Sequence, residues 1–102
     1  MECKVGARLR SVVDATEAVV VKWPGGDVDL RCGGRPMIAL GQEAPADVAA
    51  DPDFADGTAI GKRYSDEALG LELLVTKAGQ GSLSIGSTIL ELKSAKPLPS
   101  SD

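Results

Sequence analysis

The sequence predicts an all-β protein, a small barrel or sandwich of about seven or eight short antiparallel strands with one long acidic loop. Apolar residues make up 43% of the 102 residues but aromatic residues only 3%, so the core must be aliphatic. Abundant β-branched residues and 12 glycines favour short strands joined by turns. Turn signals recur about every 8–12 residues, a spacing typical of sandwiches and barrels.

The first strand is predicted over residues 5–13, where apolar positions alternate with arginines. Its buried face would carry Val5, Ala7, Leu9, Ser11 and Val13, with Arg8 and Arg10 on the solvent face. A β-branched run at 16–23 predicts a second strand, and Pro24 to Asp27 predict a turn. Residues 27–32 alternate again, so 16–23 and 27–32 are predicted to form a β-hairpin.

A second turn is predicted at 33–36 and a short strand at 37–40. The segment 41–58 is rich in Ala, Asp and Pro, and predicts a long acidic loop with one helical turn at 46–50. Residues 43–67 carry seven acidic residues and only two basic ones. A structureless loop of this length is unusual in a compact domain unless it serves a function or is disordered.

Order is predicted to return at 60–64, followed by a strand at 69–77 and a hairpin at 82–93 with its turn at Gly86–Ser87. The inward side chains would be Leu69, Leu71, Leu73, Val75, Leu83, Ile85, Leu90 and Leu92. A short helix near 65–70 is the alternative for that segment. We expect one β domain over 1–95 and a flexible polar tail at 96–102. No internal repeat is strong enough to guide the prediction.

Composition excludes several classes of function. The net charge is −4, and the chain has no cluster of Lys and Arg of the kind that binds nucleic acid or a membrane. Neither is therefore expected as a partner. The chain has no histidine, which removes Ser-His-Asp catalysis and His-ligated metals. Two cysteines and no secretory signal predict a cytoplasmic protein with reduced thiols.

The stretch "VDLRCGGRPM", residues 28–37, resembles the second knuckle of desulforedoxin and related rubredoxin-like metal domains. In that family a strand ends in two cysteines, followed by Gly, two residues and Met. Cys32, Gly34 and Met37 match this pattern, but Gly33 stands where the second cysteine belongs. The first C-x-x-C is also absent. The resemblance implies a zinc or iron site, which two cysteines cannot complete.

Candidate site residues follow from this stretch and its flanks. If a metal were bound, its ligands would be Cys32 and Asp14, and Val75 is a third position on a strand that could end near Cys32. Otherwise Cys32 is an inward small hydrophobe or a thiol activated by Arg31 and Arg35. Trp23 would pack at the rim of the core or present an aromatic binding surface. The candidate binding residues are therefore Trp23, Arg31, Cys32 and Arg35.

Three functions remain open. The leading hypothesis is a non-catalytic domain without a cofactor that binds a protein partner or forms a homo-oligomer, as an accessory or assembly module. A metal-binding or redox domain of the rubredoxin-like group is the second. An enzyme or ligand-binding barrel that uses Cys32 or carboxylates is the third.

Overall fold

The computed structural model of the protein describes residues 1–44 and 48–93, and these residues form an all-β fold, as predicted. They contain ten strands, one 3-10 turn at Pro52–Phe54 and no α-helix. The strands are β1 (Arg8–Arg10), β2 (Glu17–Lys22), β3 (Leu30–Cys32), β4 (Arg35–Pro36), β5 (Ile38–Ala39), β6 (Arg63–Asp66), β7 (Leu71–Lys77), β8 (Leu83–Ile85), β9 (Thr88–Ile89) and β10 (Glu91–Lys93).

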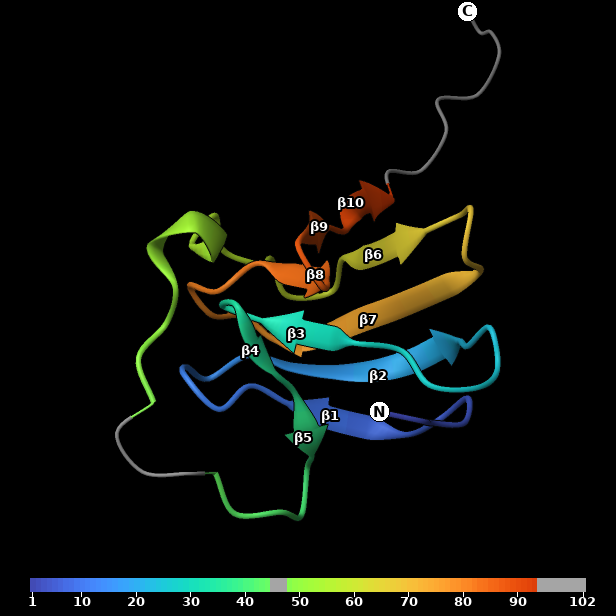
Figure 1. Ribbon diagram of the computed structural model, residues 1–102, viewed down its shortest axis with the longest axis horizontal. Coiled ribbons are helices and arrows are strands. Elements are labelled where there is room, and N and C mark those ends of the chain that lie inside the picture. The colour runs from blue at the N-terminus through green and yellow to red at the C-terminus, as the bar shows by residue number, and fades with distance from the viewer. Residues whose placement is uncertain (45–47, 94–102) are drawn as a thin grey trace, which may run out of the picture.

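The strands form two antiparallel sheets that pack as a sandwich and not as a closed barrel. The larger sheet has the order β10-β6-β7-β2-β1-β5, and the smaller has the order β4-β3-β8-β9. Figure 1 shows β3 and β8 of the smaller sheet lying across β7 and β2 of the larger one. The described parts of the predicted acidic loop lie at one end of this sandwich.

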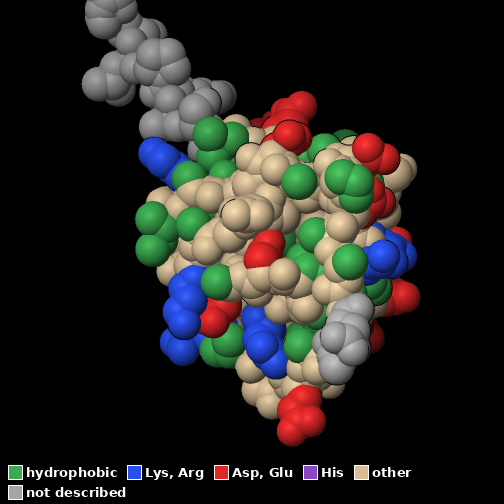
Figure 2. All heavy atoms as spheres, turned by 90° about the vertical axis from the view of Figure 1, so that its left-hand side faces the viewer, with side chains coloured by type: hydrophobic (Ala, Val, Ile, Leu, Met, Phe, Trp, Pro, Cys, Tyr) green, Lys and Arg blue, Asp and Glu red, His purple; other side chains and the backbone are tan. Residues whose placement is uncertain are grey.

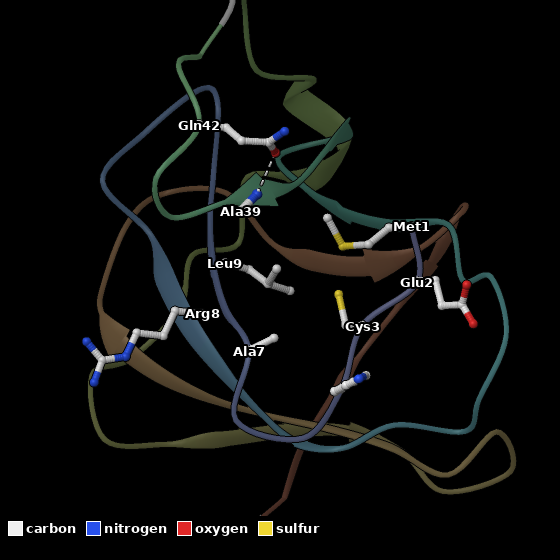
Figure 3. A pocket seen from close by; sticks show the side chains of 9 residues that line it. Met1, Glu2, Cys3, Ala7, Arg8, Leu9, Ala39 and Gln42 are labelled. Atoms are coloured by element: carbon white, nitrogen blue, oxygen red, sulfur yellow. Dashed lines mark hydrogen bonds between the residues drawn. The ribbon is translucent and has the colours of Figure 1, made fainter.

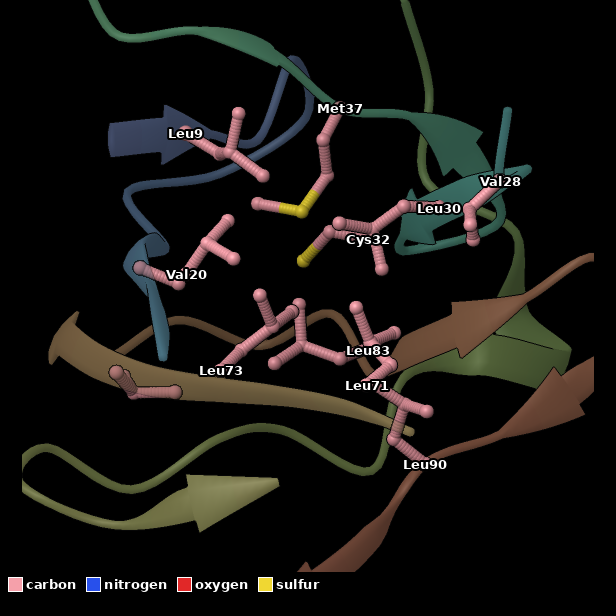
Figure 4. Close-up of a cluster of buried hydrophobic side chains, with 12 residues drawn as sticks. Leu9, Val20, Val28, Leu30, Cys32, Met37, Leu71, Leu73, Leu83 and Leu90 are labelled. Atoms are coloured by element: carbon pink, nitrogen blue, oxygen red, sulfur yellow. The ribbon is translucent and has the colours of Figure 1, made fainter. Parts of the chain in front are cut away.

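An aliphatic core fills the space between the sheets, as composition predicts. Its buried members come from both sheets: Leu9, Ala18, Val20, Val28, Leu30, Cys32, Met37, Leu71, Leu73, Val75, Leu83 and Leu90. Figure 4 shows the sulfur of Cys32 pointing into this cluster, between Val20, Leu73 and Met37. The alternation in β3 therefore predicted the direction of Cys32 correctly.

Two strands bend from one sheet into the other, and each bend is a single buried residue. Met37 joins β4 to β5, and Leu90 joins β9 to β10. The Met37 N–H donates to the Leu30 carbonyl at 3.1 Å, and the Leu90 N–H donates to the Leu83 carbonyl at 2.9 Å. Counted as bent strands, these four short segments reduce ten strands to eight, which reconciles the structure with the predicted number.

The two halves of the chain repeat the same arrangement of strands. We call residues 4–39 the N-terminal half and residues 59–92 the C-terminal half. The pairing of β1 with β2 recurs in β6 with β7, shifted by 55 residues, so that Leu9↔Ala18 corresponds to Tyr64↔Leu73. The pairing of β3 with β4 recurs in β8 with β9, shifted by 53 residues. The chain therefore contains a structural repeat that sequence analysis missed.

A pseudo-twofold axis relates the halves, because the strands that join them pair symmetrically. In the β2–β7 ladder, Ala18↔Val75 is matched by Val20↔Leu73, with Val19↔Leu74 between them. In the β3–β8 ladder, Leu30↔Ile85 is matched by Cys32↔Leu83, with Arg31↔Ser84 between them. Each half thus completes both sheets of the other, and the axis runs through these two central pairs.

The predicted hairpin of 16–23 with 27–32 is wrong. β2 lies in the larger sheet and pairs with β1 and β7, whereas β3 lies in the smaller sheet and pairs with β4 and β8. The positive φ angles of Gly25 and Gly26 support a bend there, as predicted. A bend reverses the chain without fixing which sheet the next strand joins, and alternation suits either outcome.

Several local predictions are also corrected. The segment predicted as a turn at 33–36 contains β4, and the strand predicted at 37–40 is only Ile38–Ala39. Residues 65–70 form the end of β6 and a turn, not a helix. The helical turn predicted at 46–50 falls partly outside the described residues, and 48–50 are not helical. The tail predicted at 96–102 lies outside them entirely.

Three predicted inward residues are exposed instead: Val5 at 66%, Leu69 at 40% and Leu92 at 50%. Val5 and Leu69 sit in turns and not in strands. Leu92 is opposite Tyr64, which is opposite the buried Leu73, so it does lie on the inner face of the larger sheet. It is half exposed because it stands on the edge strand β10.

Candidate functional site

Cys32 is fully buried, and its surroundings keep the thiol protonated. Burial raises the pKa of Cys32 to about 11, with a further contribution from the nearby Asp14 carboxylate. The flanking arginines do not offset this, because Arg31 donates to Asp29 at 3.0 Å and Arg35 donates to the Ala49 carbonyl at 3.0 Å. The geometry therefore fits the inward hydrophobe better than an activated thiol.

Asp14 lies near Cys32, as predicted, but its carboxylate is bonded to backbone groups. It accepts from the Thr16 N–H at 2.9 Å and from the Gly81 N–H at 2.6 Å. Burial alone would raise its pKa, but hydrogen bonds from Thr16, Gly81 and Ser11 outweigh burial and hold the pKa of Asp14 below its usual value. Asp14 thus ties the β1–β2 loop to the β7–β8 loop.

These residues do not make a ligand set for the zinc or iron that the knuckle resemblance implies. Cys32 supplies one thiol inside an apolar core, and Val75 is a fully buried core residue. Within residues 1–44 and 48–93, no group of three or more Cys, Asp or Glu side chains is placed to hold a metal ion. β3 and β4 pair as a hairpin, but they do not supply the set of metal ligands that a knuckle needs.

The other predicted binding residues point in different directions. Arg31 lies on the outer face of the smaller sheet, where it pairs with Asp29 and donates to the Gly34 carbonyl at 3.1 Å. Trp23 packs against the core and donates from Nε1 to the Gly26 carbonyl at 3.1 Å. Arg35 is exposed and holds the segment that follows β5. The structure therefore does not gather the four side chains into one site.

A cavity of about 770 Å³, which sequence analysis missed, lies between residues 1–4 and the edge of the larger sheet. It is lined mainly by apolar side chains from the N-terminal segment, β1 and β5. Figure 3 shows Met1, Cys3 and Leu9 pointing toward the same space, with Ala39 and Gln42 at its rim. Burial raises the pKa of the Cys3 thiol above its ordinary value, so Cys3 itself is uncharged at neutral pH. Its size and lining are typical of a small-ligand pocket.

An exposed edge forms a second candidate surface, on β9 and β10. Ile89 is 40% exposed on β9 and Leu92 is 50% exposed on β10. A groove of about 370 Å³ runs between β9 and the β6–β7 turn. Among the described residues, no basic side chain lines it, and three carboxylates do so together with Ile89: Asp66, Glu67 and Glu91. We call this surface the β9–β10 edge.

The equivalent edge of the N-terminal half holds the chain's own loop. Arg10 and Arg35 correspond to Ser65 and Thr88 of the C-terminal half. Arg10 donates to the Gln42 carbonyl at 2.6 Å, and Arg35 donates to the Ala49 carbonyl. The described parts of the predicted loop 41–58 are thus bound to the sandwich, and Asp51 N–H adds a bond to the Gly33 carbonyl.

The end of the molecule on the left of Figure 1 shows no concentrated charge. Figure 2, which faces that end, shows basic and acidic side chains interspersed with apolar ones. This distribution gives no electrostatic surface on that face that would attract a polyanion. No helix in the described part of the chain has the length and apolar character needed to cross a membrane.

Comparison of the chain with protein-family models, curated protein sequences and solved structures finds no match. The resemblance of residues 28–37 to a rubredoxin-like knuckle therefore stays a prediction. The candidate sites are defined by the geometry of this chain and by the differences between its two halves.

Proposed function

We propose that the protein is a binding module that takes an extended segment of a partner protein along its β9–β10 edge. One observation carries the proposal: the halves use equivalent edges differently. In the N-terminal half, two arginines hold the chain's own loop, whereas the β9–β10 edge exposes Ile89 and Leu92. An exposed strand edge with apolar side chains is a template for strand addition by another chain.

The charge of the edge indicates the chemistry of the partner. Asp66, Glu67 and Glu91 would attract a segment bearing Lys or Arg, and such attraction weakens as salt screens it. A second copy of this chain is a less suitable occupant, because its net charge of −4 would be repelled by the acidic groove. We therefore favour a separate protein over a homo-oligomer.

A photo-crosslinking amino acid placed at position 89 tests the proposal in the native host. We expect one predominant cross-linked protein, lost when Leu92→Lys is introduced and reduced when salt is raised. The matched control places the same cross-linker at Ile60, an exposed apolar residue outside both the edge and the cavity. Equal products from both positions would count against the edge. Light scattering of the purified chain checks for self-association, and a stable dimer would replace the separate partner.

A further inference from the structure

The cavity beside β1 borders two positions at which the C-terminal half carries larger side chains. Leu9 and Ala39 border the cavity and are directly opposite each other in the β1–β5 ladder. Their equivalents are Tyr64 and Leu92, directly opposite each other in the β6–β10 ladder. A phenol ring and a larger aliphatic chain in one half thus stand where the other half has Leu and Ala.

The backbone around the two positions is the same. The Gly6 N–H donates to the Val20 carbonyl at 2.8 Å, and the Gly61 N–H donates to the Val75 carbonyl at 2.9 Å. The Ala7 N–H donates to the Lys4 carbonyl, and the Lys62 N–H donates to the Ala59 carbonyl. Val5 and Ile60, at the tips of these two turns, are almost equally exposed at 66% and 65%. Leu9 and Tyr64 therefore differ in their side chains, whereas the backbone around them is equivalent.

The tyrosine hydroxyl also has a defined partner. Tyr64 Oη accepts a hydrogen bond from the Ala59 backbone N–H at 2.9 Å. The equivalent of Ala59 is Lys4, which lines the cavity. The N-terminal half therefore places a backbone N–H donor at the position where the C-terminal half binds a phenolic oxygen, and it carries the smaller Leu9 in place of the tyrosine ring.

We infer that this cavity binds a para-substituted phenol, with the ring between Met1, Cys3 and Leu9 and the hydroxyl accepting from the Lys4 N–H. The ligand is either a small phenol or the tyrosine side chain of another protein, since both offer the same ring and oxygen. The inference does not depend on the β9–β10 edge, which lies in the other half of the chain.

Titration of the ¹⁵N-labelled protein with 4-methylphenol tests the inference by NMR. We expect saturable shifts at Lys4 and Ala39, with a dissociation constant of about 1 mM, as befits a fragment of this size. Toluene, which lacks the hydroxyl, should bind at least about fivefold more weakly, because a polar site discriminates strongly against a ligand without its hydroxyl. Equal affinity for toluene, or no saturable shift with 4-methylphenol, would overturn the inference.

Variants that exchange the two halves' side chains provide matched controls. Leu9→Tyr should fill the cavity and abolish the shifts, and Ala39→Leu serves the same purpose if Leu9→Tyr fails to fold. The reciprocal double variant Tyr64→Leu/Leu92→Ala should create a second site, with new shifts at Ala59. Persistence of full affinity in a folded Leu9→Tyr protein would place the ligand elsewhere and end the proposal.

A last comparison separates the two sources of the phenol. N-acetyltyrosinamide carries the peptide backbone that a partner's tyrosine would carry, and 4-methylphenol does not. Binding of both supports a site open to a protein side chain, whereas binding of 4-methylphenol alone supports a small-molecule site. Failure of the β9–β10 cross-linking leaves either result unaffected, so the two proposals can fail separately.

Discussion

At the scale of single residues, Cys32 and Arg31 lie on opposite faces of β3. Cys32 is in the core, and Arg31 forms a 3.0 Å ion pair with Asp29 on the outer face. Strand alternation predicted both positions, but it could not predict that Glu72 would be 2% exposed, with its carboxylate 3.5 Å from Arg63. The burial of a charge depends on what covers the outer face of a sheet, which strand periodicity does not encode.

The buried thiol makes stability fall with alkaline pH. The pKa of Cys32 is about 11 in the folded protein against an ordinary value of 9.0, so the folded state binds the proton more tightly. The resulting stabilisation is complete below pH 9 and is lost as pH rises toward 11. It amounts to about 3 kcal/mol by linkage.

Urea unfolding of the wild type and of Cys32→Ala, at pH 7 to 11, measures how much Cys32 contributes to stability at each pH. Subtracting the variant removes the contribution of every other titratable group. We expect the difference in free energy of unfolding to be constant up to about pH 9 and to shrink above it. A difference that stays constant to pH 11 would mean that Cys32 is not desolvated as the structure indicates.

At the scale of elements, turn chemistry predicted the positions of bends well and the pairing of strands poorly. The Gly86–Ser87 turn joins β8 and β9 as expected, and Gly33–Gly34 joins β3 and β4 in the same way. The sequence predicts the wrong bounds for β4 and β9, the strands that follow these two turns. A single buried residue ends each of them and sends the chain to the other sheet. Neither Met37 nor Leu90 differs from an ordinary core residue in the sequence.

The two equivalent turns offer a test of backbone strain against packing. Gly33 and Gly86 have similar positive φ angles of 63° and 57°. A Cβ at Gly33 would lie 2.6 Å from Val13 Cγ2, whereas the nearest atom to a Cβ at Gly86 is 3.7 Å away. Gly86→Ala should cost about 1 kcal/mol from φ alone, and Gly33→Ala about 1–3 kcal/mol more from overpacking.

Urea unfolding of both variants gives the comparison, and Val13→Ala provides the control. Because the clash is with one rigid, β-branched side chain, Val13→Ala should rescue part of the loss in Gly33→Ala and none in Gly86→Ala. Equal losses in the two single variants would show that the contact with Val13 does not govern the turn.

At the scale of the whole molecule, composition and turn spacing predicted the all-β class and its aliphatic core. The repeat escaped sequence analysis because few equivalent positions share a residue, among them Gly6 and Gly61, Glu17 and Glu72, and Gly33 and Gly86. The shift between halves also changes from 55 to 53 residues, since the β2–β3 connection is longer than the β7–β8 connection. The cavity was missed because the segments that line it, residues 1–9 and 39–42, come together only in the folded chain.

The interlocked halves should unfold together. Because β2 pairs with β7 and β3 pairs with β8, neither half retains a complete sheet without the other. We expect Trp23 fluorescence, which reports on the N-terminal half, and far-UV circular dichroism, which reports on all strands, to give one coincident transition in urea. Loss of the Trp23 signal at a lower urea concentration would indicate that the halves unfold independently.

The axis itself has a consequence for the history of the sequence. Arg31 and Ser84 face each other at equivalent positions, as do Val19 and Leu74. Had the chain arisen by fusion of two copies of one gene segment, each of these residues would first have faced its own duplicate. Two valines or two leucines tolerate that arrangement, but two arginines directly opposite each other repel. Duplication of a segment that carried Arg at this position would therefore have put the Arg31–Ser84 pair under pressure to diverge.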